Sequence, residues 1–379
     1  RDPDAVLLIF KEPLLLPDGS KTNERMIVRE RDEKRELWTG RMATPGEVER
    51  ISGAQEVRVS TESISLKVPF DQYKKVFVLR FPKGLEDDKS DAYDLFDLVK
   101  NIREEIGNQS AELDDFSLEK MVAGLREIKS KEELQLLQKA IDISVEGHLR
   151  MMDSVRAGWK EYQVESVGEY YFHHLGAEDV GYPSICGASE NGCVLHYDKN
   201  RRTVTAGDLI LLDMGAEYHG YTADITRTIP VSDSFTEPQR LLYELVWQAQ
   251  QAGMDSCISG KDFRAPHRAA LSVIEDGLIR LGIITKKEEA RQYFPHSTSH
   301  YLGLDVHDPG GYGPLRPGQV ITVEPGLYIP SDSDCDTKWW NIGIRIEDDI
   351  LITEGVPVNM SGALPSRLDL LEKYLKSHP

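Results

Sequence analysis

The sequence has few cysteines, no long apolar run and a shortage of positive charge. Its four cysteines form no Cys-x-x-Cys pair and are too sparse for a disulfide framework, so we expect a reducing, cytoplasmic location. No run reaches the roughly 18 apolar residues of a transmembrane helix, which argues against a membrane span. With 45 Lys and Arg against 64 Asp and Glu, the net charge of −19 argues against nucleic acid and anionic lipid as partners.

The remaining composition is that of a folded protein. Hydrophobic residues make up 40% and charged residues 29% of the sequence, which is typical of a globular chain rather than a disordered one. The length of 379 residues suffices for two or three domains if each takes about 150 residues. The sequence opens at Arg1 with no methionine or signal-peptide pattern, and an apolar run begins at Val6, so we expect a longer native chain.

The first third of the sequence alternates short apolar runs with polar segments. Apolar runs lie at residues 6–10, 26–28 and 76–79, and residues 92–106 carry apolar side chains at helical spacing. Strands interleaved with helix predict a small α/β domain over residues 1–115. No catalytic cluster stands out in this domain, so we interpret it as a support or oligomerisation module.

The remaining residues, 116–379, repeat one order of elements. Ser130 and Glu133 have the spacing of a capping box, which predicts a helix start followed by an amphipathic stripe. Helical patterns give way to β-type runs over residues 181–231, and the same succession ends in a second β-rich segment over 295–354. We therefore predict an internally duplicated α+β domain.

Carboxylates stand at the ends of apolar, strand-like runs in both β-rich segments. One run leads into Asp213, and a return strand predicted over 223–226 carries Asp224, so a hairpin would bring them together. Two further runs lead into Glu324 and Glu347. Opposed buried carboxylates raise a pKa unless a cation lies between them, and Glu is rarely buried unpaired. For Asp213 and Asp224 alone, it is equally possible that one of them only caps a turn. Because acids follow apolar runs again at Glu324 and Glu347, a cation site becomes the favoured interpretation.

Three histidines lie between these acids, in the segment HSTSHYLGLDVHD. His296 and His300 have the spacing of a helical zinc-peptidase pair, but Ser297 stands where that motif needs glutamate. A lone histidine is usually a satisfied core residue or part of a solvated loop. Beside four carboxylates, a ligand or catalytic role becomes the favoured interpretation.

The charges of this set balance two divalent cations. Four ionised carboxylates carry −4 and two divalent ions supply +4, with one imidazole completing the site. Oxygen ligands with little nitrogen and no sulfur favour Mn²⁺, with Co²⁺, Fe²⁺ or Zn²⁺ as alternatives. Two metals about 3.5–4 Å apart can hold one hydroxide between them and polarise a carbonyl. The residues thus predict a dinuclear hydrolase and leave its substrate open.

The strings LLLDMGAEYHGYTADITRTIPV, HSTSHYLGLDVHD, ITVEPGLYIP and GIRIEDDILIT resemble the pita-bread metallopeptidases of the Xaa-Pro aminopeptidase and prolidase branch. The resemblance covers about residues 116–360. It implies a C-terminal pita-bread (creatinase/aminopeptidase-like) catalytic domain preceded by a smaller α/β domain. It also implies five metal ligands, two of them bridging both ions (Asp224 and Glu347): Asp213, Asp224, His300, Glu324 and Glu347. The other implied catalytic residues are His196, His296, His307 and Arg345.

The resemblance also implies a reaction. A bond before proline is a tertiary amide without an N–H, and a metal-bridging hydroxide would attack its carbonyl to release the first residue of the peptide. Glu324 would act as general base and then acid, and His307 would stabilise the oxyanion. The free α-amine of the substrate would be held at the metal site. The expected partners are peptides with an N-terminal Xaa-Pro and further copies of the chain, as a dimer or tetramer.

We consider three alternatives to this hypothesis. A prolidase takes only Xaa-Pro dipeptides, and the sequence does not show which residue would hold the proline carboxylate. A creatinase-like amidinohydrolase shares the fold without the metal ligands, so the intact set argues against it. Relatives that are binding modules, histone-chaperone domains among them, have also lost these ligands. Metal content distinguishes a binding module from the enzymes.

Overall fold

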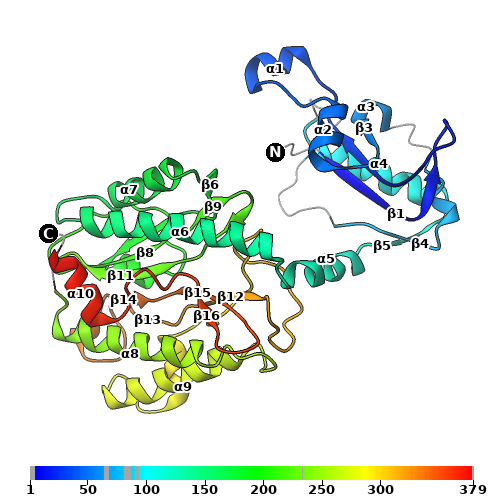
Figure 1. Cartoon of the computed structure of the whole chain (residues 1–379). Helices are drawn as coiled ribbons and strands as arrows, with labels where there is room; N and C mark the ends of the chain where they lie inside the picture. The colour runs from blue at the N-terminus through cyan, green and yellow to red at the C-terminus, as the bar shows by residue number, and fades with distance from the viewer. Residues whose placement is uncertain (1–4, 64–67, 81–86, 90–93, 233, 378–379) are drawn as a thin grey trace. The chain divides into compact units, whose positions relative to one another are not determined.

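The computed structural model describes residues 5–63, 68–80, 87–89, 94–232 and 234–377 (Figure 1). The chain divides into two compact units, Arg1–Met121 and Val122–Pro379. The domain limits expected from the sequence, at residues 115 and 116, stay a prediction. The expected helix over 92–106 begins at residues that lie outside the described ones.

The first unit is a small α/β module. Strand β1 pairs antiparallel with β2, β2 pairs parallel with β3, and β4 pairs parallel with β5. Its core packs Phe10 and Ile27 of the sheet against Leu98 and Ile102 of α4. The strands are β1 (Val6–Leu15), β2 (Lys21–Val28), β3 (Val57–Val59), β4 (Lys75–Phe77) and β5 (Glu112–Asp114). The helices are α1 (Glu33–Thr39), α2 (Pro45–Ser52), α3 (Ser60–Ser63), η1 (Phe70–Gln72) and α4 (Leu95–Asn108), and α5 (Ser117–Glu127) runs across the division.

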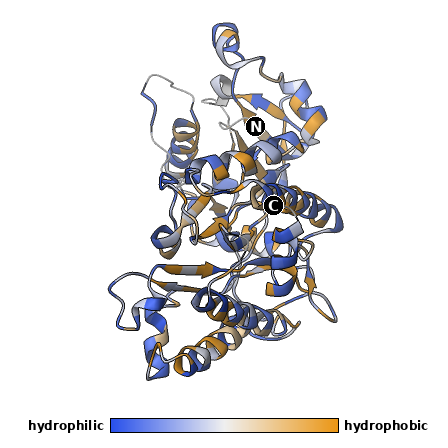
Figure 2. Cartoon of the chain, turned by 90° about the vertical axis from the view of Figure 1, so that its left-hand side faces the viewer, coloured by the Kyte–Doolittle hydropathy of each residue, from blue (hydrophilic) through white to orange (hydrophobic). Residues whose placement is uncertain are grey.

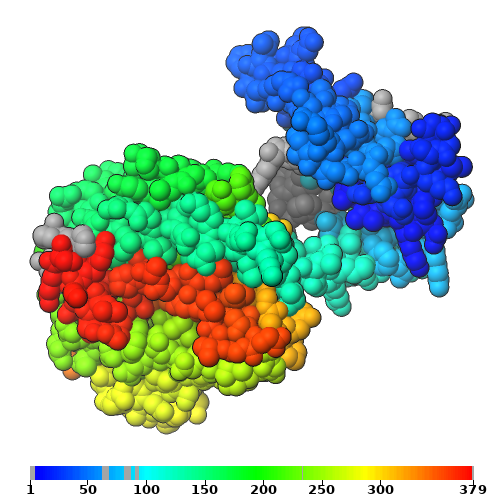
Figure 3. Space-filling view, viewed as in Figure 1, coloured from blue at the N-terminus to red at the C-terminus, as the bar shows by residue number. Residues whose placement is uncertain are grey.

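The second unit carries two helix pairs, α6 with α7 and α8 with α9, on opposite sides of its strands (Figure 1). The predicted start of α6 is confirmed: Ser130 Oγ accepts from the N–H of Glu133, whose carboxylate accepts from the N–H of Ser130. The helices that face the viewer in Figure 2 carry hydrophobic and hydrophilic residues together, and α10 lies on the surface of the unit (Figure 3). The helices are α6 (Lys131–Ser154), α7 (Glu161–His174), η2 (Ser189–Cys193), α8 (Glu237–Met254), α9 (Ala265–Arg280), η3 (Lys287–Gln292), η4 (Thr337–Trp339) and α10 (Leu368–Ser377).

The strands of this unit repeat between its two halves. In the first half the orders are β11-β8-β7 and β10-β9-β6, and in the second half β12-β15-β16 and β13-β14. The first-half strands are β6 (Asp179–Val180), β7 (Ile185–Ala188), β8 (Leu209–Asp213), β9 (Ala216–Tyr218), β10 (Tyr221–Thr222) and β11 (Thr226–Pro230). The second-half strands are β12 (Val320–Val323), β13 (Gly326–Ile329), β14 (Ile342–Arg345), β15 (Asp348–Leu351) and β16 (Val358–Asn359). The expected succession of helices and then β-structure is present in both halves.

The return strand predicted over 223–226 is wrong in its limits. Thr226 pairs with Asp213, and β11 begins only at Thr226, so Asp224 stands two residues before the strand. The chain between them forms an extra hairpin of β9 and β10. The hairpin displaces the return strand toward the C-terminus, because the ladder opposite β8 starts only after the hairpin closes. The two aspartates are nevertheless on adjoining chain segments.

The two halves meet through backbone bonds close to these acids. The N–H of Glu347 donates to the carbonyl of Thr226 at 3.1 Å, which joins the second half to the edge of β11. Close packing on this side needs a glycine: a Cβ added at Gly343 would lie 2.1 Å from the carbonyl oxygen of Gly192. Within the part of the chain that the structure describes, every helix is too short or too polar to cross a lipid bilayer.

Candidate metal centre

The second unit contains a cavity of about 520 Å³ that is lined by every site residue selected from the sequence. They are His196, Asp213, Asp224, His296, His300, His307, Glu324, Arg345 and Glu347. A cavity of this volume lies within the range of small-molecule sites. The structure therefore brings the selected residues together, and their individual roles stay proposals.

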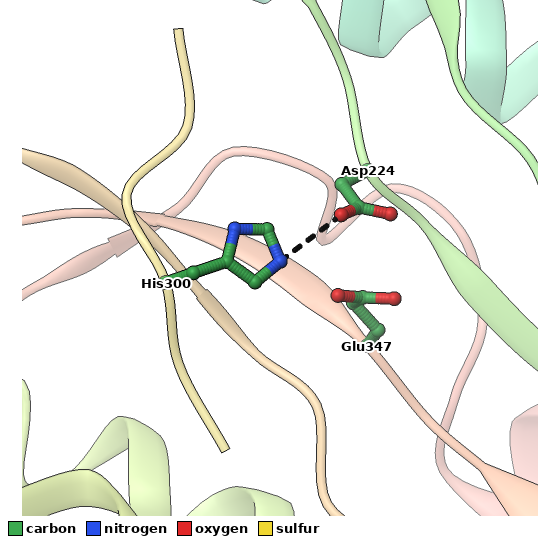
Figure 4. A group of neighbouring side chains, drawn as sticks. All are labelled: Asp224, His300 and Glu347. Atoms are coloured by element: carbon green, nitrogen blue, oxygen red, sulfur yellow. Dashed lines mark ion pairs between the residues drawn. The ribbon is translucent and has the colours of Figure 1, made fainter. Parts of the chain in front are cut away.

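Two aspartates enter the cavity from the first half. Asp213 is the last residue of β8 and Asp224 precedes β11, and both are buried. Arg345 Nη2 donates to Asp213 Oδ2 at 2.5 Å, and the Tyr182 hydroxyl donates to Asp213 Oδ1 at 2.7 Å. These two donors fix one carboxylate, while the side chain of Asp224 faces His300 and Glu347 (Figure 4).

Two glutamates enter from the second half. Glu324 follows β12 directly, and Glu347 stands between β14 and β15. The Thr226 hydroxyl donates to Glu347 Oε2 at 2.6 Å. The N–H of Glu324 donates to the carbonyl of Thr298 at 2.9 Å, which aligns the histidine-containing segment with the end of β12. Strand ends from both halves thus deliver their acids to one cavity.

His300 lies among these carboxylates. Its Nε2 is 3.3 Å from Asp224 Oδ2 and 3.6 Å from Glu324 Oε1. Its Nδ1 lies 3.0 Å from the carbonyl oxygen of Tyr301, an acceptor only, so Nδ1 carries a hydrogen. When the ring is neutral, the lone pair is therefore on Nε2, which is directed at the carboxylates. This is the arrangement of a histidine that ligates a metal through Nε2.

The charges in the cavity do not balance by themselves. Burial raises the pKa of Glu324 to about 7 and that of Glu347 well above its usual value, and the Asp224 carboxylate contributes to both. Burial lowers the pKa of His300, but its contact with Asp224 outweighs this and raises it to about 9. With all four carboxylates ionised, one guanidinium from Arg345 and one imidazolium, the charges would sum to −4 + 1 + 1 = −2. The raised pKa values mean that the metal-free site takes up protons to avoid this charge, and a bound cation could balance the carboxylates in place of those protons.

Divalent cations fit this site. Ligand atoms of Asp224, His300 and Glu347 all lie within 4.8 Å of one another, and the side chains converge on one point (Figure 4). Buried carboxylate oxygens with one imidazole nitrogen are suitable ligands for first-row divalent metals. A bound cation would lower the pKa values that burial and like charge raise here. The residue set therefore fits metal binding better than it fits a solvent-filled pocket.

The other three histidines occupy different parts of the cavity wall. His296 is largely buried, its Nε2 lies 2.8 Å from the Tyr328 hydroxyl, and burial lowers its pKa to about 4, so the ring is neutral. His307 is exposed to the cavity, with its ring centroid 4.4 Å from that of His300. His196 is exposed on the same cavity. None of the three belongs to the Asp224–His300–Glu347 group.

Sequence reasoning missed the two tyrosines that support the site. The hydroxyl of Tyr328 contacts His296 and also accepts from Arg345 Nη1 at 2.8 Å, so one phenol links a histidine to the arginine. Tyr182 holds Asp213 from a loop before β7. A tyrosine inside the apolar strand 326–329 was a signal for the first. The sequence around Tyr182 contains none, because that contact is formed only by the tertiary fold.

A duplicated α+β unit whose carboxylate-rich cavity fits divalent cations places the chain in the class of metal-binding α+β proteins. The chain belongs to metallopeptidase family M24, whose family model matches residues 135–354. Residues 1–69 match the model described as aminopeptidase P, N-terminal domain. The fold predicted from the sequence, a pita-bread domain after a smaller N-terminal domain, is thereby confirmed.

Similar proteins are known from bacteria and plants. The chain is 38% identical over 267 residues to a Xaa-Pro aminopeptidase of Haemophilus influenzae, which covers 67% of this chain and 62% of the relative. It is 33% identical to the mitochondrial intermediate cleaving peptidase 55 of Arabidopsis thaliana, over 89% of this chain and 68% of the relative. The chain thus spans about three fifths of the length of the bacterial relative.

Solved structures resemble the whole chain. Proline aminopeptidase P II from Yersinia pestis matches with a TM-score of 0.85 and 32% identity, over 98% of this chain and 87% of that one. The aminopeptidase PepP structure from Pseudomonas aeruginosa matches with a TM-score of 0.84 and 31% identity, over 97% and 87%. The similarity to these structures therefore extends over both units of the chain.

Proposed function

We propose that this chain is a metal-dependent aminopeptidase that releases the N-terminal residue from peptides with proline in the second position. The observation that carries the proposal is the convergence of four carboxylates and the Nε2 of His300 in one cavity. Membership of metallopeptidase family M24 and likeness to Xaa-Pro aminopeptidases support the choice of reaction. None of the relatives reported above is named a prolidase, so the dipeptidase alternative is not favoured.

The metal-holding residues in this proposal are Asp213, Asp224, His300, Glu324 and Glu347. Two divalent ions bound there would supply Lewis acidity toward the peptide carbonyl and toward a water molecule. We propose Mn²⁺ as the native metal because the donors are mainly carboxylate oxygens, with Co²⁺, Fe²⁺ and Zn²⁺ as alternatives. The resemblance to the pita-bread metallopeptidases implies that Asp224 and Glu347 would serve both ions, and the ligand atoms of both lie close to that of His300.

Proton transfer falls to Glu324. Its carboxylate lines the cavity beside His300, where it can take up and release a proton during the reaction. We propose that Glu324 takes a proton from the attacking water and delivers it to the proline nitrogen as the Xaa-Pro bond breaks. The proline nitrogen needs this proton because a secondary amine is the leaving group.

The histidines would bind and orient the substrate, and Arg345 would hold one of the acids in place. His307 is exposed to the cavity and close to His300, where a ring N–H can donate to the oxyanion of the carbonyl under attack. His196 offers a second donor from the wall. His296 stays neutral and is held by Tyr328, while Arg345 fixes Asp213. Residues that are already hydrogen-bonded need little reorganisation when a peptide binds.

Two further proposals accompany the activity. The four cysteines are free thiols, which supports a reducing, cytoplasmic location. We also propose a homo-oligomer, a dimer or tetramer, with the first unit contributing to its interface. Size-exclusion chromatography with light scattering tests the second point: a mass of one chain at every concentration would contradict it.

Peptide hydrolysis tests the proposed function. Ala-Pro-Ala should be split into Ala and Pro-Ala in the presence of Mn²⁺, and a chelator should stop the reaction. Ala-Ala-Ala should be a poor substrate, because the fixed φ of proline near −65° preorganises the peptide for a matching pocket. Acetylation of the α-amine should abolish cleavage. Cleavage of Ala-Pro but not Ala-Pro-Ala would assign the chain to prolidase, and equal activity on Ala-Ala-Ala would contradict both.

A further inference from the structure

A second cavity, of about 720 Å³, adjoins the metal centre and is strongly basic. We call it the arginine pocket. Its walls include Arg264, His267, Arg268, Arg291, Phe263 and Tyr312. This concentration of guanidinium groups contrasts with the net charge of −19 of the chain.

The pocket is built on one face of α9. Arg264, His267, Arg268 and Leu271 follow the spacing i, i+3, i+4 and i+7, which places them on the same side of the first helical turns. Arg291 approaches from η3. Burial lowers the pKa of His267, and the three guanidinium groups lower it further, which is consistent with a positive potential in the pocket. The helix therefore directs its basic residues to one place.

The pocket keeps positive charge that the described residues do not neutralise. Asp262 Oδ1 pairs with Arg268 Nη1 at 3.0 Å, which offsets one of three guanidinium charges and leaves 3 − 1 = +2. Within the described ranges, the side chains of Arg264 and Arg291 make no hydrogen bond or ion pair with the protein. Two unpaired guanidiniums in a concave site are suitable donors for a carboxylate.

The arginine pocket shares a wall with the catalytic cavity. Ser297 and Ser299 line both cavities, and the Ser299 hydroxyl is buried without a hydrogen-bond partner among the described residues. Between them, Thr298 joins the two sites: its hydroxyl lies 3.0 Å from His267 Nδ1, and its carbonyl accepts from the N–H of Glu324. A peptide that extends from the catalytic cavity over this wall would reach the guanidiniums of the arginine pocket.

We infer that the arginine pocket binds a carboxylate of the peptide substrate on the C-terminal side of the proline. The carboxylate is either the chain end of a short peptide or an acidic side chain of a longer one. This inference rests on the proposed function, because the shared wall makes the pocket an extension of the peptide site. The rings of Phe263 and Tyr312, with centroids 4.8 Å apart, add an apolar surface that suits a peptide better than an inorganic anion.

The length of the peptide determines whether its C-terminal carboxylate reaches the arginine pocket. An extended residue spans about 3.3–3.6 Å, so each added residue moves the chain end by a known step. The experiment measures kcat and KM for Ala-Pro-(Ala)n peptides with n from one to four, each as the free acid and as the C-terminal amide. At the length that reaches the pocket, the acid should have a KM about threefold to fivefold below that of the amide, the size expected for a partly exposed ion pair. The kcat should be the same for both.

Variants of the arginine pocket test whether its arginines cause the lower KM of the free acids. Arg264→Gln and Arg291→Gln should each reduce the acid preference, and the double variant should remove it with kcat unchanged. Arg280→Gln, at the exposed C-terminal end of α9 and outside the pocket, is the matched control and should keep the preference. An amidated peptide with Asp at the position where the free acid lowered KM tests whether an acidic side chain can replace the C-terminal carboxylate. A low KM for this peptide would show that the pocket binds acidic side chains as well as chain ends.

Three results would overturn the inference. Equal KM values for acids and amides at every length would show that the pocket does not bind the substrate. A preference that survives in the Arg264→Gln/Arg291→Gln double variant would place the carboxylate elsewhere. If no Ala-Pro peptide is cleaved at all, the proposed function fails and this inference with it, whereas cleavage without charge preference refutes the inference alone.

Discussion

Asp224→Asn tests whether the buried acids exist to hold metal. Asparagine has the same shape, and the backbone N–H of residue 224, which donates to Asp349 Oδ2 at 3.2 Å, is untouched, so the fold should persist. With all acids ionised, the metal-free site then changes from a net charge of −2 to −1, which relieves repulsion, but the ion pair between Asp224 and His300 is lost as well. We therefore expect a metal-free protein about as stable as the wild type, together with a loss of metal binding and turnover.

The size of the effect follows from linkage. Replacing a group that only supports a ligand typically weakens metal binding about 10- to 100-fold, so losing a ligand itself should weaken it by about 100-fold or more. With Mn²⁺ at about 100 times the wild-type Kd, one site stabilises the wild type by about 2.7 kcal/mol. The same concentration stabilises the variant by only about 0.4 kcal/mol. The wild type should then gain about 5–10 °C in Tm on adding Mn²⁺ and the variant about 1 °C.

Thermal unfolding with and without Mn²⁺, combined with elemental analysis, measures this difference. Asp179→Asn is the matched control, because that aspartate is exposed on β6 and outside the cavity, and it should behave like the wild type. The reasoning is refuted if Asp224→Asn keeps the full Mn²⁺-dependent rise in Tm and its metal content. A variant that is strongly destabilised without metal would also refute it, since Asp224 would then have a structural role.

Three further predictions concern other parts of the second unit. His307→Ala should keep the metal content and lower kcat about 10²- to 10³-fold; parallel loss of metal, seen by elemental analysis, would make it a ligand. Gly343→Ala should cost about 1–3 kcal/mol in urea unfolding, because the new Cβ would lie 2.1 Å from the Gly192 carbonyl, whereas Gly355→Ala has no atom within 4 Å and should be neutral. In the metal-free protein, the raised pKa of His300 contributes stability that is complete below about pH 6.5 and lost as pH rises through about 9. Unfolding free energies across this pH range check the sign, and Mn²⁺ affinity should rise over the same interval because binding displaces that proton.

Local signals predicted much of the fold. The capping box of Ser130 and Glu133 and the apolar stripe behind it lie within one stretch of chain, and α6 begins where they predict. The runs before Glu324 and Glu347 form strands because their apolar side chains fill the core between the helix layers. The limits of the return strand after Asp213 could not be found in this way. They depend on the β9–β10 hairpin, whose strands of three and two residues are too short to show a periodic pattern in the sequence.

In the candidate site, too, local signals were found in the sequence and tertiary contacts were not. Acids at strand ends are recognisable in the sequence because a charge following an apolar run is unusual. Their supporting partners are not, since Tyr182, Tyr328 and Thr226 reach the site only through tertiary contacts. The arginine pocket was missed for another reason: exposed arginines on a helix are usually solvated. Only the structure shows that Arg264 and Arg291 face one cavity.

Metal titration of activity tests the central claim most directly. Metal-free protein is titrated with Mn²⁺ while hydrolysis of Ala-Pro-Ala and calorimetric binding are followed on the same samples. The account predicts that full activity is reached at two ions per chain. His300 must lose its proton to act as a ligand, so four ionised carboxylates and Arg345 leave −4 + 1 = −3, which is more than one divalent cation balances. Full activity at one ion, with no second binding event, would contradict it.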